Sequence, residues 1–173
     1  MSDETHGGRA GGRFDVVFAL NFGLPADLPA NRIIAEAARR SSQAHQIPIF
    51  SAPAGIFDFA GHPTSLSGDF PGYVSTVKQV DALTAAAQTH GWRRVLVVAA
   101  PPHAWRALRD VRAAGFIAQI DRSVFGEPRR IWYAKESEHR QTTAAWRWWL
   151  TWELPARAVI LLRRPWYEAR ARR

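Results

Sequence analysis

The sequence of 173 residues contains no cysteine, and none of its apolar runs approaches the length of a membrane-spanning helix, roughly 18 residues. The absence of cysteine excludes a disulfide scaffold, a thiolate zinc site and a cysteine nucleophile. The stretch 1–13 is polar and rich in glycine, unlike the apolar core of a secretory signal. We therefore expect a soluble, cytoplasmic protein with no membrane span.

Lysine is also scarce. Lys78 and Lys135 are the two lysines among 23 Lys+Arg residues, although the formal net charge is +8. Such an arginine bias is typical of GC-rich coding sequences, and the stems of helical arginines can cover apolar surface. The positive charge is densest in residues 163–173, which we interpret as a solvated tail. The charge therefore says little about partners despite the high pI, and we do not expect a nucleic acid as the partner.

Short apolar runs alternate with segments of helical periodicity. The predicted strands are 14–20, 47–52, 94–100, 116–120 and a short 131–134, with 158–162 as a further candidate. The predicted helices are 31–44 with Asn31 as N-cap, 75–91 opened by Ser75 or Thr76, 101–113 and 137–153. Residues 53–73, rich in glycine and proline, are predicted to form a functional loop.

This alternation predicts a doubly wound α/β fold with a mainly parallel sheet, a Rossmann-like arrangement of three layers. We expect one domain, 14–162, between a flexible segment 1–13 and the basic tail 163–173. In such sheets the ligand lies beyond the carboxyl ends of the strands. The predicted ligand-binding residues follow strands or open helices: Asn21, Arg32, Ser51, Ser75, Thr76, Lys78 and Gln79.

His103 and Arg106 are the predicted catalytic residues. Both lie in the first turns of the helix that begins after Ala100, three residues apart and hence on one face. The helix N-terminus lowers the expected pKa of His103 and attracts an anion. A neutral imidazole beside a guanidinium suits a general base with a charge-stabilising partner. The alternative is that His103 packs against the sheet while Arg106 pairs with Asp110.

Several common signatures are missing. The loop after the first predicted strand reads NFGLP instead of GxGxxG, and neither GxxxxGK[ST] nor GxSxG occurs. His62, Asp58 and Asp69 share the long loop without the spacing of metal ligands, so we predict no metal site. The cofactor stays open, with S-adenosylmethionine or a nucleotide as candidates.

Four tryptophans gather near the C-terminus, at Trp146, Trp148, Trp149 and Trp152. At helical spacing they cover more than one face, which indicates a helix wedged into the core or an interface with a partner. The second interpretation predicts a homo-oligomer formed through residues 146–152. Base stacking is a third alternative.

The block 75–120, STVKQVDALTAAAQTHGWRRVLVVAAPPHAWRALRDVRAAGFIAQI, resembles the central part of the YdcF-like proteins, the SanA and ElyC group that carries the domain of unknown function 218. The residues that match in order and spacing are Thr76, the strand 94–100, His103, Arg106, Ala107 and Gly115, and the family's arginine in the first helix could correspond to Arg32. A Glu-Asn pair of the family is replaced by Lys78 and Gln79. The resemblance implies a bacterial protein with an α/β fold and a pocket at His103.

Two functional hypotheses follow. The first is a small-molecule site for a phosphorylated or nucleotide-like anion, with hydrolysis or group transfer as the reaction. The second is a non-catalytic interaction module that uses the tryptophan-rich helix.

Overall fold

We describe a computed structural model of the protein. The structure describes residues 14–52, 57, 59, 65–67, 75–133, 150, 151, 154, 155, 157 and 158. The segment 1–13, the tail 163–173 and the four tryptophans of the predicted interface helix lie outside the described residues. So does most of the candidate strand 158–162.

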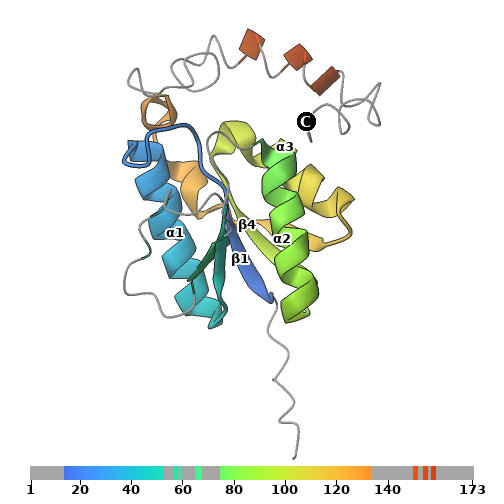
Figure 1. Ribbon diagram of the computed structural model, residues 1–173. Coiled ribbons are helices and arrows are strands. Elements are labelled where there is room, and N and C mark those ends of the chain that lie inside the picture. Colours follow the sequence, from blue (N-terminus) through green and yellow to red (C-terminus); the bar gives the residue numbers. More distant parts are fainter. Residues whose placement is uncertain are drawn as a thin grey trace, which may run out of the picture.

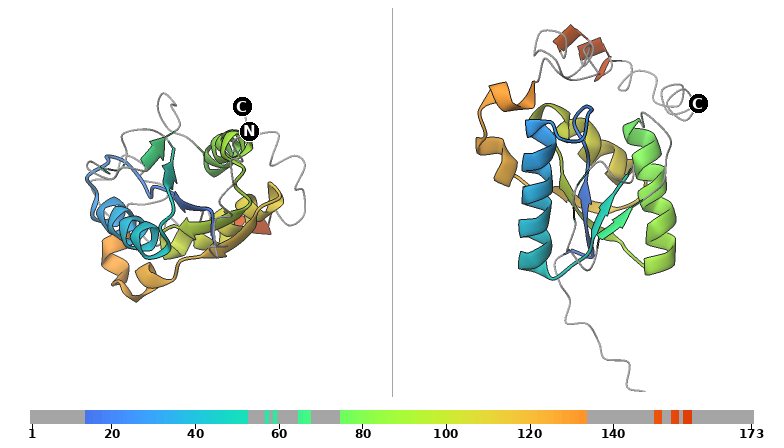
Figure 2. Two further views of the ribbon diagram at one scale, coloured as in Figure 1. Left: turned by 90° about the horizontal axis from the view of Figure 1, so that it is seen from below. Right: turned by 60° about the vertical axis from the view of Figure 1, so that its left-hand side comes forward.

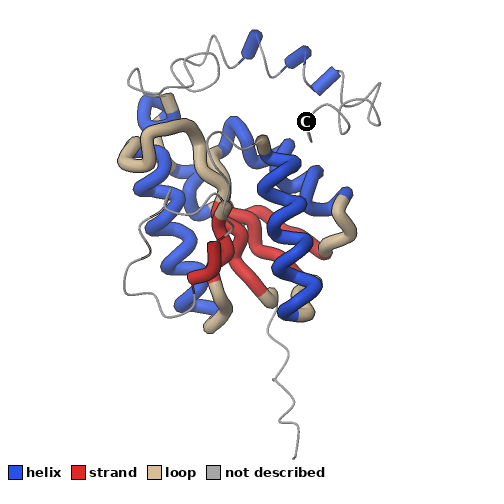
Figure 3. Tube along the Cα trace, viewed as in Figure 1, coloured by secondary structure: helices blue, strands red, loops and turns tan. Residues whose placement is uncertain are grey.

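Five parallel strands form one sheet in the order β3-β2-β1-β4-β5. Their bounds are β1 Val16–Ala19, β2 Ile49–Ser51, β3 Ser65–Ser67, β4 Arg94–Val98 and β5 Ile117–Ile120. The helices are α1 Pro29–His45, α2 Thr76–His90 and α3 Pro101–Ala113. Figure 1 labels the three helices, β1 and β4, and Figure 3 shows the strands gathered between the helices. The predicted doubly wound, parallel α/β fold is confirmed.

Helices cover both faces of the sheet. Val17, Ile49 and Leu96 belong to the apolar cluster that packs under α1, whereas alternate residues such as Val16 and Val95 pack under α2 and α3. The three layers are visible in the two views of Figure 2. β1 is buried along its whole length, and β4 is buried after Arg94. Such burial is typical of the near-continuous apolar strands in parallel sheets.

The strand order reverses at β1, because the chain moves from β1 to β2 on one side and later enters β4 on the other. The connections that leave β1 and β4 therefore part in opposite directions, and in open α/β sheets the ligand crevice lies at the carboxyl ends of two such strands. In this chain that edge of the sheet carries Asn21, which follows β1, and Pro101, which begins α3.

Two helix ends follow the sequence signals closely. Ser75 is the N-cap of α2, where its hydroxyl accepts a hydrogen bond from the backbone N–H of Lys78 at 3.4 Å. Gly91 ends the same helix with a φ of 72°, a left-handed conformation that glycine adopts without steric cost.

Three local predictions are wrong. β3 lies inside the segment 53–73, which the sequence indicated as a loop. The predicted short strand 131–134 is instead a 3-10 helix, η2 Arg129–Trp132, preceded by a second 3-10 helix, η1 Ser123–Gly126. α1 begins at Pro29 after Leu28, so Asn31 is not its N-cap.

Asn31 holds the loop between β1 and α1. Its side chain is 1% exposed, accepts the backbone N–H of Phe22 at 2.8 Å, and donates to the carbonyls of Gly23 at 3.1 Å and Pro25 at 3.3 Å. Buried backbone groups need such partners, because the loop lies off the sheet ladder and cannot pair with a strand. One amide thus fixes the path of the chain out of β1.

We expect Asn31→Ala to lower the free energy of unfolding by about 1 to 3 kcal/mol, because it leaves the buried N–H of Phe22 without its acceptor and removes two further bonds of the loop. Urea denaturation measures this change. Gln43→Ala on the exposed side of α1 is the control, and it should change stability by less than about 0.5 kcal/mol. Equal effects of the two substitutions would contradict the role assigned to Asn31.

Candidate functional site

The first turns of α2 and α3 meet at the crevice beside β1 and β4. The Oγ1 atom of Thr76 lies 3.1 Å from Nε2 of His103, and Nδ1 of His103 lies 3.0 Å from Nη2 of Arg106. We call these three residues the Thr76–His103–Arg106 group. A second contact joins α2 to the loop after β1, where Nε2 of Gln79 donates to Oδ1 of Asn21 at 3.2 Å.

The neighbours of His103 determine its protonation. A guanidinium has donors and no acceptor, so Nδ1 of His103 must accept from Arg106. The neutral ring then carries its proton on Nε2 and donates it to the hydroxyl of Thr76. Burial, and after it the positive charge of Arg106, hold the pKa of His103 well below its usual value of 6.5. His103 is therefore neutral at physiological pH. The predicted direction of the pKa shift is confirmed, but its causes are burial and Arg106 and not the helix N-terminus.

The direction of the hydrogen bond between His103 and Thr76 determines which donors the Thr76–His103–Arg106 group can offer to a ligand. Since the oxygen of Thr76 accepts from His103, its own proton can be donated elsewhere. Arg106 adds a half-buried positive charge next to it. Thr76 is the first residue of α2, and Arg106 lies in the second turn of α3, and the dipoles of both helices favour negative charge at these ends. A hydroxyl donor, a guanidinium and two helix N-termini together suit an anionic group.

The loop after β1 is fixed relative to this group. Asn21 accepts from Gln79 and donates from Nδ2 to the carbonyl of Gly23 at 3.3 Å. Gly23 has a φ of 91°, which a residue with a Cβ rarely adopts. The turn that carries Asn21 past the crevice therefore depends on this glycine.

The other predicted ligand residues lie apart from the group. Ser75 uses its hydroxyl to cap α2, and Lys78 is half-buried one turn further on. Arg32 is exposed on α1. Ser51 is buried at the end of β2, where it pairs in register with Ala19. Among the described residues, no hydrogen bond joins Arg32 or Ser51 to the Thr76–His103–Arg106 group, and their roles stay predictions.

The sequence also allowed a second pairing, in which Arg106 contacts Asp110 further along α3. Asp110 is buried and accepts from Nε of its neighbour Arg109 at 3.0 Å. Arg106 reaches the other way along the helix, to His103. The spacing of three residues between His103 and Arg106 thus corresponds to a direct contact, as expected.

Sequence reasoning missed the aromatic side of the site. The ring of Phe22 lies 6.4 Å from that of His103 and 6.2 Å from that of Tyr133, measured between centroids. Phe22 lies three residues after the end of β1, so its position after a strand was a usable signal. Tyr133 comes from the end of η2, and no local pattern connects it to His103 across thirty residues of chain.

Within the parts of the chain that the structure describes, no group of three or more His, Asp or Glu side chains could hold a metal ion. In those same parts, no helix is long and apolar enough to cross a membrane. The loop residues His62, Asp58 and Asp69 lie outside the described residues.

Comparison with known proteins identifies no relative: no protein-family model, curated protein or solved structure matches this chain.

The buried neutral imidazole predicts a pH dependence of stability. In the unfolded chain His103 takes up a proton near pH 6.5, whereas the folded protein resists protonation until a lower pH. The contribution of this residue is thus complete above pH 6.5 and is lost as the pH falls, at about 1.4 kcal/mol per pH unit until the folded-state pKa is reached.

Urea denaturation between pH 8 and pH 5 measures this loss. His103→Gln keeps a donor and an acceptor but does not titrate, so the slope below pH 6.5 should be reduced in that variant. The same slope in both proteins would contradict the assignment to His103.

Proposed function

We propose that this chain is a YdcF-like protein that binds a small phosphorylated or nucleotide-like anion in the crevice at β1 and β4 and acts on it as a hydrolase or transferase. The observation that carries the proposal is the neutral imidazole of His103, held between the hydroxyl of Thr76 and the guanidinium of Arg106. The motif from Thr76 to Gly115 that resembles the family contains all three residues.

Each residue of the group has a defined part in binding. Arg106 pairs with the anionic oxygens, and its fixed fork suits a phosphoryl or carboxylate group. Thr76 donates its hydroxyl proton to another of these oxygens. The N-termini of α2 and α3 add favourable dipoles at no cost of reorganisation.

Ligand binding would also prepare the base. In the ligand-free arrangement the lone pair of His103 at Nδ1 is engaged by Arg106. An anion that draws the guanidinium away releases this lone pair, and its negative charge offsets the positive charge that lowers the pKa of His103. His103 can then take a proton from an attacking water or hydroxyl group while Arg106 stabilises the developing charge. The imidazole becomes a base when the substrate is in place.

The cofactor stays open between S-adenosylmethionine and a nucleotide. Both present an anionic group that could pair with Arg106, a carboxylate in the first case and phosphates in the second. Thermal-shift measurements with inorganic phosphate, AMP and S-adenosylmethionine separate them, because a ligand that binds the folded state raises its stability.

Removing the ligand contacts should weaken binding. We expect Arg106→Gln to reduce the affinity for inorganic phosphate or AMP by about 10- to 100-fold, the range expected for a lost charge-assisted hydrogen bond. Thr76→Val should reduce it by about 5- to 10-fold, since it removes a neutral one. Isothermal titration calorimetry measures both.

Arg93→Gln is the matched control for charge. Arg93 is exposed and precedes β4, at the opposite end of the strand from the crevice. Its loss should leave affinity unchanged. The site would be wrong if Arg93→Gln weakened binding as much as Arg106→Gln.

Catalysis makes a separate prediction. With p-nitrophenyl phosphate as substrate, His103→Gln should lower kcat by about 10²- to 10⁴-fold, the usual contribution of a general base. Phosphate affinity, measured in parallel, should change far less. Full activity in this variant would exclude His103 as the base, and binding without turnover by the unsubstituted protein would favour the non-catalytic alternative.

A further inference from the structure

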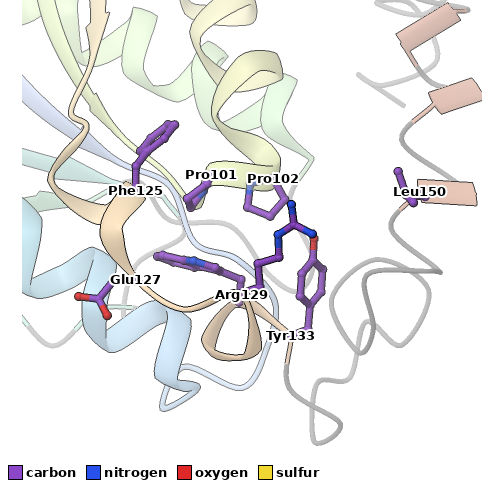
Figure 4. A pocket seen from close by; sticks show the side chains of 8 residues that line it. Pro101, Pro102, Phe125, Glu127, Arg129, Tyr133 and Leu150 are labelled. Carbon is purple, nitrogen blue, oxygen red and sulfur yellow. The ribbon is translucent and has the colours of Figure 1, made fainter.

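A cavity of about 470 Å³ opens at the start of α3, between this helix and the 3-10 helices η1 and η2. This volume lies in the range of pockets that bind small molecules. Its walls are mostly apolar, and Figure 4 shows the side chains that face it. Its lining includes Pro101, Pro102, Phe125, Trp132 and Tyr133, together with one residue of each charge, Arg129 and Glu127. We call this cavity the α3 pocket.

The α3 pocket adjoins the Thr76–His103–Arg106 group. Pro102, which lines the pocket, and Arg106 lie four residues apart on α3 and are neighbours on its surface. Phe22 connects the two regions a second time, because its ring contacts both His103 and the pocket residue Tyr133. A single ligand can therefore reach from the guanidinium of Arg106 into the α3 pocket.

The walls favour a flat aromatic group over a flexible chain. Phe125, Trp132 and Tyr133 supply aromatic rings, and the guanidinium of Arg129 supplies a planar cation that attracts the face of a π-system. Trp132 is 3% exposed and packs in the core, so its position does not depend on the ligand. Phe125 is 45% exposed and has apolar surface left for a ligand to cover.

We propose that the α3 pocket binds the aryl ring of a ligand whose anionic group lies at Thr76 and Arg106. The inference rests on the proposed function, since it assigns the second half of the same ligand. It narrows the substrate class to anions that carry an aromatic ring.

Three phosphonates test the inference, because their C–P bond resists hydrolysis. Methylphosphonate presents the anion with almost no apolar surface, phenylphosphonate adds the ring, and hexylphosphonate adds an open chain of the same number of carbons. We expect phenylphosphonate to bind at least 10-fold more tightly than methylphosphonate and at least 3-fold more tightly than hexylphosphonate. Isothermal titration calorimetry gives all three affinities.

Phe125→Ala removes a partly exposed wall of the pocket, so folding should be preserved. It should weaken phenylphosphonate binding about 5- to 10-fold and leave methylphosphonate binding unchanged. Ile117→Ala is the control, because Ile117 is 67% exposed on β5 and does not line the α3 pocket. That substitution should leave the affinities of both ligands unchanged.

The outcomes separate the two proposals. Equal affinities for the three phosphonates, with methylphosphonate binding lost in Arg106→Gln, would overturn the aryl pocket and support the proposed function. Equal affinities for phenyl- and hexylphosphonate would overturn the preference for a ring. Methylphosphonate binding that survives Arg106→Gln, or no binding of any of the three, would overturn the proposed function and the inference with it. Equal weakening by Phe125→Ala and Ile117→Ala would exclude the pocket.

Discussion

β1 and β4 lie side by side at the centre of the sheet, and apolar side chains project from both faces of each strand. Such strands can be joined in parallel when helices cover both faces, because a parallel connection must cross from one end of the sheet to the other. α1 covers one face, and α2 and α3 cover the other. Polar side chains find room at the strand ends, and the reversal of strand order opens a crevice at the carboxyl ends of β1 and β4.

His103 relates this architecture to the candidate chemistry. The imidazole lies in the first turn of α3 and contacts the first turn of α2, so it links two helices that the sequence separates by β4. Its two nitrogens have different partners, one a donor and the other an acceptor, and these partners require the neutral ring. The same arrangement fixes the hydroxyl of Thr76 and the guanidinium of Arg106, the two groups that we propose bind one anion.

The sequence predicted the elements whose signals are local. β1 and β4 are uninterrupted apolar runs, α2 has a serine cap and a terminal glycine, and α3 begins with two prolines that its first turn accepts. The pair His103 and Arg106 was found because helical spacing places residues three apart on one face. Local patterns failed where tertiary contacts decide the conformation. β3 has few apolar residues and forms by pairing with β2, and the stretch that ends at Trp132 turns into a 3-10 helix whose tryptophan packs into the core.

At Asn31, too, the local pattern gave a wrong prediction because tertiary contacts decide the role of the side chain. Its position near a helix start indicated a cap, but the helix begins two residues earlier and the amide bonds the loop after β1 instead. The sequence by itself determined the fold class, the helix that carries His103 and Arg106, and the edge of the sheet where they lie, since these depend on periodicity and on the order of elements. The tertiary structure decided that Thr76 is the partner of His103, that Asn21 meets Gln79, and that the ring of Phe22 lies between those of His103 and Tyr133. These contacts join residues far apart in the chain, and their geometry is defined when the sheet assembles.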